Sequence, residues 1–215
     1  MSSEPPKKYA IALFTGFQAL DAFGSLDALN ILSFETPLEL CVLSTTLDPV
    51  STIPSPAKSG IIGQSVVPTH TYKDAPKDIE VLLVPGGYGT EDLESTQPIV
   101  DYIKTAFPNL RYLLTVCTGS SLAARSGVLD GKNATSNKLL FDWVAALGPN
   151  VKWVRHARWV HDGNIWTSSG VSAGIDMLYD FMANQYGEDV AARVAEVAEY
   201  IRNTDPSNDP FDKSS

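Results

Sequence analysis

The order of apolar segments along the chain is the feature that most constrains its fold. Short apolar runs alternate with segments in which apolar residues recur every three or four positions, as they do on one face of a helix. Strands that are apolar on both faces are typical of a parallel sheet covered by helices on both sides. The sequence therefore predicts an α/β protein, a flavodoxin-like three-layer α/β/α sandwich with a mostly parallel central sheet.

The expected elements alternate along nearly the whole chain. Strands are expected at Lys8–Phe14, Leu38–Leu43, Val81–Val84, Leu110–Val116, Val151–Val154, Arg158–His161 and Ile165–Thr167. Helices are expected at Ala19–Leu32, Ile99–Phe107, Thr118–Arg125, Lys138–Leu147, Gly170–Tyr186 and Asp189–Ile201. Ser136 or Asn137 is expected to cap the helix that begins at Lys138. We expect one domain at 8–202, a polar N-terminal tail at 1–7 and a Pro-rich C-terminal tail or surface strap at 203–215.

Charge and composition disfavour several classes of partner. The 215 residues carry a formal net charge of −9, which argues against binding to nucleic acid or to an anionic membrane surface. The sequence has no apolar stretch of the roughly 20 residues that a membrane span needs, and its N-terminus lacks a signal-like apolar segment. Two distant cysteines, Cys41 and Cys117, suggest neither a disulfide framework nor a metal site. We therefore expect a cytoplasmic protein that acts on a small molecule.

Cys117 is the strongest candidate for a nucleophile. It follows an expected strand directly and precedes Thr118, Gly119 and an expected helix. The N–H groups at a helix N-terminus favour a thiolate and so lower the pKa of a thiol. Small residues after the cysteine allow the strained strand-to-helix turn of a nucleophile elbow. The alternative is a buried structural cysteine, which is the role we expect for Cys41.

A glycine-rich turn follows another expected buried strand. Its sequence is Pro85-Gly86-Gly87-Tyr88-Gly89, and it contains no GxGxxG dinucleotide motif. Functional groups of an open α/β sheet gather at the carboxyl ends of the strands, so this turn is expected beside Cys117. The N–H groups of Gly87 and Thr118 would then form an oxyanion hole, and Gly86 and Tyr88 would border the substrate pocket. The alternative is a turn without a role in chemistry.

Asp21, near the start of the first expected helix, fits two roles that partly exclude each other. An aspartate that caps a helix accepts hydrogen bonds and stays ionised. A carboxyl group packed against a thiolate in a dry cleft has a raised pKa and can deliver a proton. The sequence leaves both roles open.

The remaining candidates are histidines and one tryptophan. His70, His156 and His161 lack the spacing of metal ligands, and we expect them to be structural. Trp166 precedes a Thr-Ser-Ser-Gly turn and is expected to wall the substrate pocket.

Four segments together resemble the ThiJ/PfpI superfamily. They are GFQALDAFGSLDAL, VLLVPGGYGTED, TVCTGSSLAARSGVLDGKNAT and DGNIWTSSGVSAGID, and the resemblance runs from about Tyr9 to Tyr186. The chain is most similar to the isonitrile hydratase branch, whose members add water to an isocyanide to give an N-substituted formamide. The resemblance implies that Cys117 is the nucleophile and that Asp21 and Thr118 fill the other two catalytic positions of the branch. It also implies a homodimer that needs no metal or organic cofactor.

The chain departs from this branch at two places near the expected pocket. Hydratase-like sequences often read Ala-Thr-Thr-His-Trp where this chain has Ala134 to Lys138, so that Asn137 stands in place of the histidine. The turn before the penultimate helix is more polar here, and the resemblance places Ser169 and Val171 at the substrate pocket.

Three other functions stay open. A glyoxalase or deglycase of the same fold would need a glutamate on the first loop and a histidine near the nucleophile, where this chain has Asp21 and Thr118. A redox sensor would oxidise Cys117 to the sulfinate. In regulatory members of the superfamily a ligand-binding domain is fused to a DNA-binding module, which the sequence lacks and which we do not expect, also because the chain is acidic.

Overall fold

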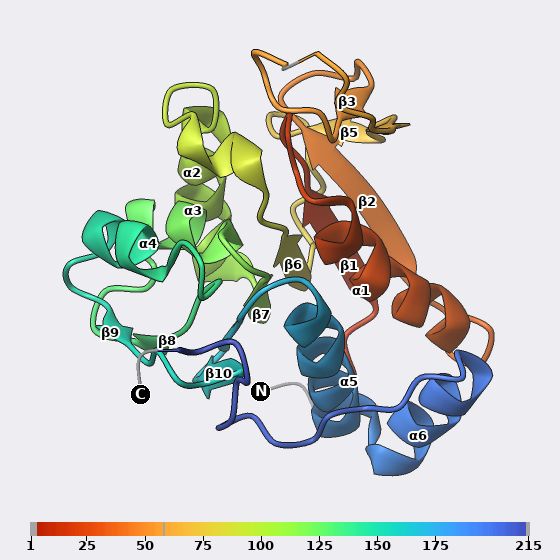
Figure 1. The fold of residues 1–215 in the computed structure, drawn as a ribbon. Coiled ribbons are helices and arrows are strands. Elements are labelled where there is room, and N and C mark those ends of the chain that lie inside the picture. Colours follow the sequence, from red (N-terminus) through yellow and green to blue (C-terminus); the bar gives the residue numbers. More distant parts are fainter. Residues whose placement is uncertain (1–3, 58, 214–215) are drawn as a thin grey trace.

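A seven-stranded sheet forms the centre of the molecule. Its strands are β1 (Lys8–Ala12), β2 (Glu39–Ser44), β5 (His70–Thr71), β6 (Val81–Val84), β7 (Tyr112–Thr115), β10 (Trp159–Asp162) and β11 (Ile165–Ser168). Their order is β10-β11-β7-β6-β1-β2-β5, and every neighbouring pair is parallel except β10 with β11 (Figure 1). This is a computed structural model, and it describes residues 4–57 and 59–213. The predicted, mostly parallel sheet is confirmed.

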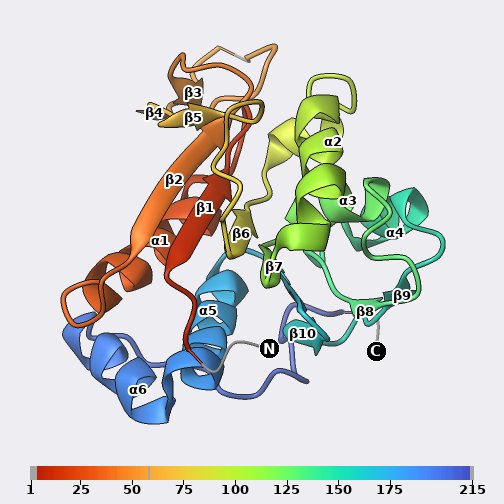
Figure 2. The ribbon, with the colours of Figure 1, turned by 180° about the vertical axis from the view of Figure 1, so that it is seen from behind.

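Helices cover both faces of this sheet. The helices are α1 (Ala19–Leu32), α2 (Gln97–Ala106), α3 (Gly119–Arg125), α4 (Phe141–Leu147), α5 (Ser172–Tyr186) and α6 (Glu188–Val197). Helices α1, α5 and α6 pack together on one face, and α2, α3 and α4 lie on the other (Figures 1 and 2). The predicted three-layer α/β/α sandwich is therefore confirmed. No helix among the described residues has the length and apolar character to cross a membrane.

The strands are buried because their side chains are apolar on both faces. All four residues of β6 are buried, and in β1 every residue after Lys8 is buried. Ile11 and Leu83 pair in register in the middle of the sheet, each with at most 2% of its surface exposed. The near-continuous apolar runs of the sequence thus correspond to strands with helices above and below.

Two helices begin two or three residues later than their sequence pattern predicts. Helix α4 begins at Phe141 instead of Lys138, because Asn137 and Lys138 turn their side chains to other partners; Asn137 Oδ1 accepts a hydrogen bond from the Leu140 N–H at 3.1 Å. Helix α5 begins at Ser172 because Val171 has a φ of 36°, outside the helical region.

Most of the short elements were not predicted. They are β3 (Val50–Ser51), β4 (Ser65–Val66), β5 (His70–Thr71), β8 (Asn133–Ala134), and the 3₁₀ turns η1 (Tyr88–Glu91) and η2 (Phe107–Asn109). A further short strand is β9 (Lys152–Trp153). Strand β3 pairs with β4, and β8 with β9. Two-residue strands carry no alternation of apolar residues, so only β9, which lies inside a predicted strand, was found from the sequence.

The expected terminal tails pack on the domain where they are described. After α6 the chain returns past α5 to β10 (Figures 1 and 2), where the Arg158 and Trp159 N–H groups donate to the Pro206 carbonyl at 2.8 and 3.3 Å. At the other end, the Lys7 N–H donates to Glu80 Oε2 at 2.6 Å. Residues 1–3 and 214–215 of the expected tails lie outside the described residues.

Candidate active site

Cys117 lies in a sharp turn between β7 and α3. Its φ is 59°, a left-handed backbone conformation that non-glycine residues rarely adopt and that often marks a functional site. Its N–H donates to the carbonyls of Ser168 and Ser169 at 3.2 and 3.1 Å. Its carbonyl accepts from the hydroxyls of Ser120 and Ser136 at 3.0 and 3.1 Å. The turn is therefore held from α3, from the end of β11 and from the segment before α4.

Two glycines allow the Cys117 turn and the turn after β6 to pack directly on each other. A Cβ added at Gly86 would lie 2.5 Å from the Thr118 nitrogen, closer than real Cβ atoms approach backbone. A Cβ at Gly119 would collide with the Val84 carbonyl oxygen. The glycines that the sequence places after two different strands therefore serve one close backbone contact.

The side chain of Asp21, on α1, contacts the turn after β6 that packs on the Cys117 turn. It lies in the first turn of this helix, whose N-cap is Gln18, and no side chain caps the helix. The helix-capping role that the sequence left open is therefore wrong. Instead, Asp21 Oδ2 accepts a hydrogen bond from the Gly86 N–H at 3.0 Å, while Oδ1 has no hydrogen-bond partner among the described residues. Only 3% of Asp21 is exposed.

The Asp21 carboxyl and the Cys117 thiol perturb each other. Burial raises the pKa of Asp21 to about 7, and hydrogen bonds from the Gly86 N–H and the Cys117 thiol act against this rise. Burial and the negative charge of Asp21 together raise the pKa of Cys117 to about 12. Near neutral pH, the pair therefore changes between holding two protons and holding one.

Three hydrogen-bond donors oppose the rise of the Cys117 pKa. They are the N–H groups of Thr118 and Val171 and the side chain of Asn137. The sequence-based expectation of a lowered thiol pKa is wrong for this state, because burial and the adjacent carboxylate outweigh these donors. The donors nevertheless lie where a thiolate would need them once Asp21 carries the proton.

The expected oxyanion hole differs from the arrangement in the structure. The Gly87 N–H already donates to Thr118 Oγ1 at 2.9 Å, so it is not free to bind a substrate atom in this state. The Thr118 N–H points to the Cys117 thiol, where the Val171 N–H and Asn137 join it. The donors thus surround the sulfur, and the side chain of Thr118, 3% exposed, holds the two turns together.

Comparison with known proteins identifies the family of this chain. The profile of the DJ-1/PfpI family matches residues 7–184. The chain belongs to this family. It is 33% identical over 204 residues to the isonitrile hydratase of Pseudomonas putida, which covers 94% of this chain and 80% of that protein. It is also 29% identical over 143 residues to the HTH-type transcriptional regulator GbdR of Pseudomonas aeruginosa, covering 66% of this chain and 38% of the regulator.

A solved structure shows the same fold over nearly the whole chain. It is a ThiJ/PfpI family protein from Pseudomonas syringae, with a TM-score of 0.79 and 26% sequence identity. The match covers 99% of this chain and 80% of that one. Together with the family match, it confirms the predicted superfamily and fold.

A cavity of about 630 Å³ lies beside the Cys117 turn of this DJ-1/PfpI chain, although neither Cys117 nor Asp21 is among the residues that line it. Asn137, Ser169 and Val171 line it, and each of them also contacts Cys117. Of the residues expected at the substrate pocket, Ser169 and Val171 line this cavity and Gly86 does not. Tyr88 is 65% exposed on η1 and does not line this cavity.

Trp166 was expected to wall the substrate pocket, and this expectation is wrong. It is 2% exposed and packs edge to face against Phe181 of α5, with ring centroids 5.6 Å apart. The His161 ring stacks on the Trp166 ring, with centroids 4.0 Å apart. The tryptophan belongs to the core, two residues before the part of β11 that reaches Cys117.

Sequence reasoning missed two polar residues of the site. Ser136 donates to the Cys117 carbonyl, and Asn137 donates to its thiol. The only signal was that Asn137 occupies the position where the hydratase branch often has histidine. An asparagine suits this position because its side-chain amide can donate a hydrogen bond to the Cys117 sulfur while its oxygen accepts one from the Leu140 N–H.

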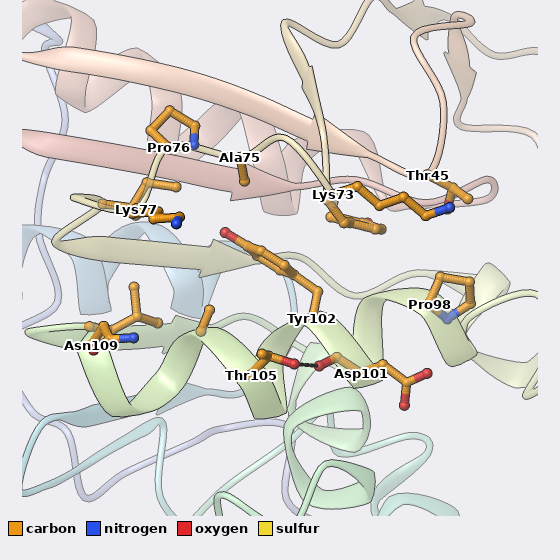
Figure 3. A pocket seen from close by; sticks show the side chains of 14 residues that line it. Thr45, Lys73, Ala75, Pro76, Lys77, Pro98, Asp101, Tyr102, Thr105 and Asn109 are labelled. Atoms are coloured by element: carbon orange, nitrogen blue, oxygen red, sulfur yellow. Dashed lines mark hydrogen bonds between the residues drawn. The ribbon is translucent and has the colours of Figure 1, made fainter.

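A second cavity, of about 610 Å³, lies away from this site between α2 and the segment that follows β5. Figure 3 shows Tyr102 across its middle and Lys73, Lys77 and Asp101 at its borders. The Tyr102 ring stacks on Tyr72 with centroids 5.1 Å apart. None of its lining residues is among those that contact Cys117, whereas Asn137, Ser169 and Val171 of the first cavity are.

The remaining cysteine and histidines take no part in the site. Cys41 lies half-buried on β2. His156 pairs with Asp212, and His70 contacts Thr69. Among the described residues, no group of three or more His, Cys, Asp or Glu side chains is arranged to hold a metal ion.

Proposed function

We propose that this chain is an isonitrile hydratase-like enzyme, with Cys117 as the nucleophile and Asp21 as the group that carries its proton. The observation that supports this most is the buried contact of the two side chains, in which Asp21 has a pKa of about 7 and a free Oδ1. The 33% identity to an isonitrile hydratase over 94% of the chain supports the same reaction.

In the first step, the proton that Asp21 and Cys117 share is transferred to the isocyanide carbon. Asp21 accepts the proton of the Cys117 thiol, and the sulfur attacks the terminal carbon of the isocyanide R–N≡C. A carbon–sulfur bond forms, and the carbon takes the proton back from the Asp21 carboxylic acid. The product is a thioimidate, R–N=CH–S–Cys117.

In the second step, water attacks the thioimidate carbon and the nitrogen gains a proton. The carbon–sulfur bond breaks, the formamide R–NH–CHO leaves, and the sulfur recovers a proton. The Thr118 and Val171 N–H groups and the Asn137 side chain face the sulfur, so they stabilise the charge that develops when it leaves. The reaction is redox-neutral and hydrates a carbon that already reacts with thiolates, so these steps call for no metal or organic cofactor.

The test is to follow formamide formation from an aryl isocyanide by absorbance and mass spectrometry. Formamide is expected from the wild type and not from Cys117→Ala. A Cys41→Ala variant is the matched control, because Cys41 is half-buried on β2 and has no contact with the site. Equal absence of product from wild type and control would reject the hydratase proposal.

The competing functions have less support from the site. A redox sensor needs a reactive thiolate, whereas burial and Asp21 raise the pKa of Cys117 to about 12. Titration with peroxide, followed by intact mass, checks this: a sensor would gain two oxygens at low peroxide excess. A deglycase would place a glutamate where Asp21 stands. GbdR is named a transcriptional regulator, and if such a role required this chain to bind DNA, the net charge of −9 would be unfavourable.

We also propose a cytoplasmic homodimer. Helix α1 exposes two large apolar side chains, Leu20 and Phe23, of which 45% and 37% remain accessible. Covering them with a second copy would remove apolar surface from water beside the turn that carries Asp21. Light scattering after gel filtration measures the mass; a value near 23 kDa, the mass of one chain, would contradict the dimer.

A further inference from the structure

The C-terminal segment, residues 203–213, is fixed to the domain at three places. The Asn203 N–H donates to Asp176 Oδ1 at 2.9 Å, where Asp176 is buried and paired with Arg158 at 2.6 Å. The Pro206 carbonyl accepts the Arg158 N–H, and the Asp209 N–H donates to the His156 carbonyl at 3.1 Å. These backbone contacts hold the segment in a defined position on the surface of the domain.

A buried ion pair joins this segment to the active site. Asp209, 1% exposed, has its Oδ2 at 3.6 Å from the ammonium nitrogen of Lys138, whose side chain is 5% exposed. Lys138 also donates to Thr135 Oγ1 at 2.9 Å and to the Ala157 carbonyl at 2.7 Å. It directly follows Asn137, which contacts the thiol of Cys117. Two consecutive residues of one short loop therefore contact the active site and the C-terminal segment. Asn137 contacts Cys117, and Lys138 pairs with Asp209.

Beyond Asp209, a turn places an aromatic ring at the cavity beside the nucleophile. The Phe211 N–H donates to Asp209 Oδ1 at 3.0 Å, and the Asp212 N–H donates to the Asp209 carbonyl at 3.1 Å. Phe211 and Leu139 both line the cavity that Asn137 and Val171 share with Cys117. Phe211 is 65% exposed and Leu139 is 84% exposed, so two large apolar side chains face water there.

We propose that the C-terminal segment is the outer wall of the substrate pocket and that Phe211 selects substrates with a bulky apolar substituent. This inference rests on the proposed function for the identity of the reacting group, an isocyanide. The substituent on its nitrogen would cover Phe211, Leu139 and Val171 while its terminal carbon meets Cys117. Removing apolar surface from water is what gives this preference.

The test uses thiol alkylation, which needs no hydratase turnover. At pH 9, Cys117 displaces iodide from iodoacetamide or from N-benzyl iodoacetamide, and mass spectrometry of the peptide that contains Cys117 gives both rates. The wild type is expected to prefer the benzyl reagent. Phe211→Ala is expected to reduce the ratio of benzyl to unsubstituted rate about tenfold, and Phe211→Leu by less than about threefold, because leucine keeps an apolar side chain.

Two controls make the outcome decisive. Phe34→Ala removes another exposed phenylalanine, 86% exposed and just after the end of α1, outside this cavity, and is expected to leave the ratio unchanged. The same ratio at Cys41 reports any general effect of a variant on both reagents. An unchanged Cys117 ratio in Phe211→Ala, or an equal change in Phe34→Ala, would overturn the inference.

Isocyanides then separate this inference from the proposed function. With cyclohexyl isocyanide, Phe211→Ala is expected to raise KM about tenfold and to change kcat less than about twofold. If the wild type forms no formamide but the alkylation ratio falls in Phe211→Ala, the role of Phe211 in the pocket wall is supported and the hydratase proposal is rejected. If the wild type forms formamide and Phe211→Ala changes neither KM nor the alkylation ratio, the role of Phe211 is rejected and the hydratase proposal is supported.

Discussion

Asp21, in the first turn of α1, and Cys117, in the turn between β7 and α3, form one titrating unit. The carboxyl group is 3% exposed and the cysteine 6% exposed, so neither charge is well solvated. Burial raises both pKa values, to about 7 for Asp21 and about 12 for Cys117. Between these values the pair holds one proton, which is what the proposed attack requires.

The pH dependence of the reaction follows from this shared proton. Below about pH 7 both groups are protonated and no thiolate can form, so kcat/KM is expected to fall tenfold for each pH unit below this value. Above it, kcat/KM is expected to stay level up to the limit of protein stability. Initial rates from pH 5 to 9 measure this; a rate that rises on acidification would contradict the assignment.

Asp21→Asn removes the proton carrier while keeping the shape of the side chain. We expect kcat/KM to fall by roughly 10²- to 10⁴-fold. The pKa of Cys117 is expected to fall, because the negative charge of Asp21 is one cause of its rise. The pH profile of alkylation by iodoacetamide measures this pKa. Asp27→Asn is the control, since Asp27 lies exposed on the same helix; a comparable loss of activity there would argue against a specific role.

The same substitution is expected to stabilise the fold at alkaline pH. The pKa of Asp21 rises from 3.8 to about 7 on folding, so the folded state binds more protons and its stability falls as the pH rises from about 4 to about 7. Asp21→Asn removes this loss. Its free energy of unfolding is expected to exceed that of the wild type by roughly 2–4 kcal/mol at pH 8, and by little at pH 4. Urea unfolding at both pH values checks the sign.

Gly86→Ala tests the close contact of the two turns. The new Cβ would lie 2.5 Å from the Thr118 nitrogen, and backbone must move to make room. We expect the free energy of unfolding to fall by roughly 2–4 kcal/mol and activity to fall with it. Gly131→Ala is the comparison, because Gly131 has a φ of 74° but no atom near its Cβ position; its cost is expected near 1 kcal/mol.

Asp209→Asn tests the buried ion pair of the C-terminal segment. Burial lowers the pKa of Lys138 to about 8 and Asp209 acts against this fall, so at pH 6 the variant keeps a buried positive charge without its partner. The free energy of unfolding is expected to fall by about 3 kcal/mol at pH 6, and by less at pH 9, where Lys138 is neutral. Glu35→Gln breaks the exposed pair with Arg193 and is expected to cost at most ~0.5 kcal/mol at either pH.

The sequence predicts the layers of the fold because its strands are apolar throughout. The predicted bounds of β6 and of α1 match the structure at both ends. The glycine-rich turn after β6 and the Cys117 turn after β7 were expected to be neighbours, and in the structure Gly86 packs directly against Thr118. These features depend on local periodicity and on sheet topology, which a single sequence carries.

The sequence does not predict features that depend on tertiary packing. Trp166 follows the pattern of a strand that ends at the site, but the face of β11 that it occupies meets Phe181 and the core. The pKa of Cys117 depends on its burial and on the negative charge of Asp21 beside it. Neither can be read from a local sequence motif. The contact of Asp209 with Lys138 joins residues 71 positions apart, where the sequence shows only a polar tail.

The measurement that tests the central claim most directly is detection of the intermediate on Cys117. Wild-type protein is mixed rapidly with an isocyanide labelled with ¹³C at the terminal carbon, quenched, and analysed by peptide mass spectrometry. We predict an adduct of one isocyanide on the peptide that contains Cys117, formed and lost at rates that match formamide release, and none in Cys117→Ala. Formamide produced at the same rate by Cys117→Ala, or produced by the wild type with the label on a different residue, would contradict it.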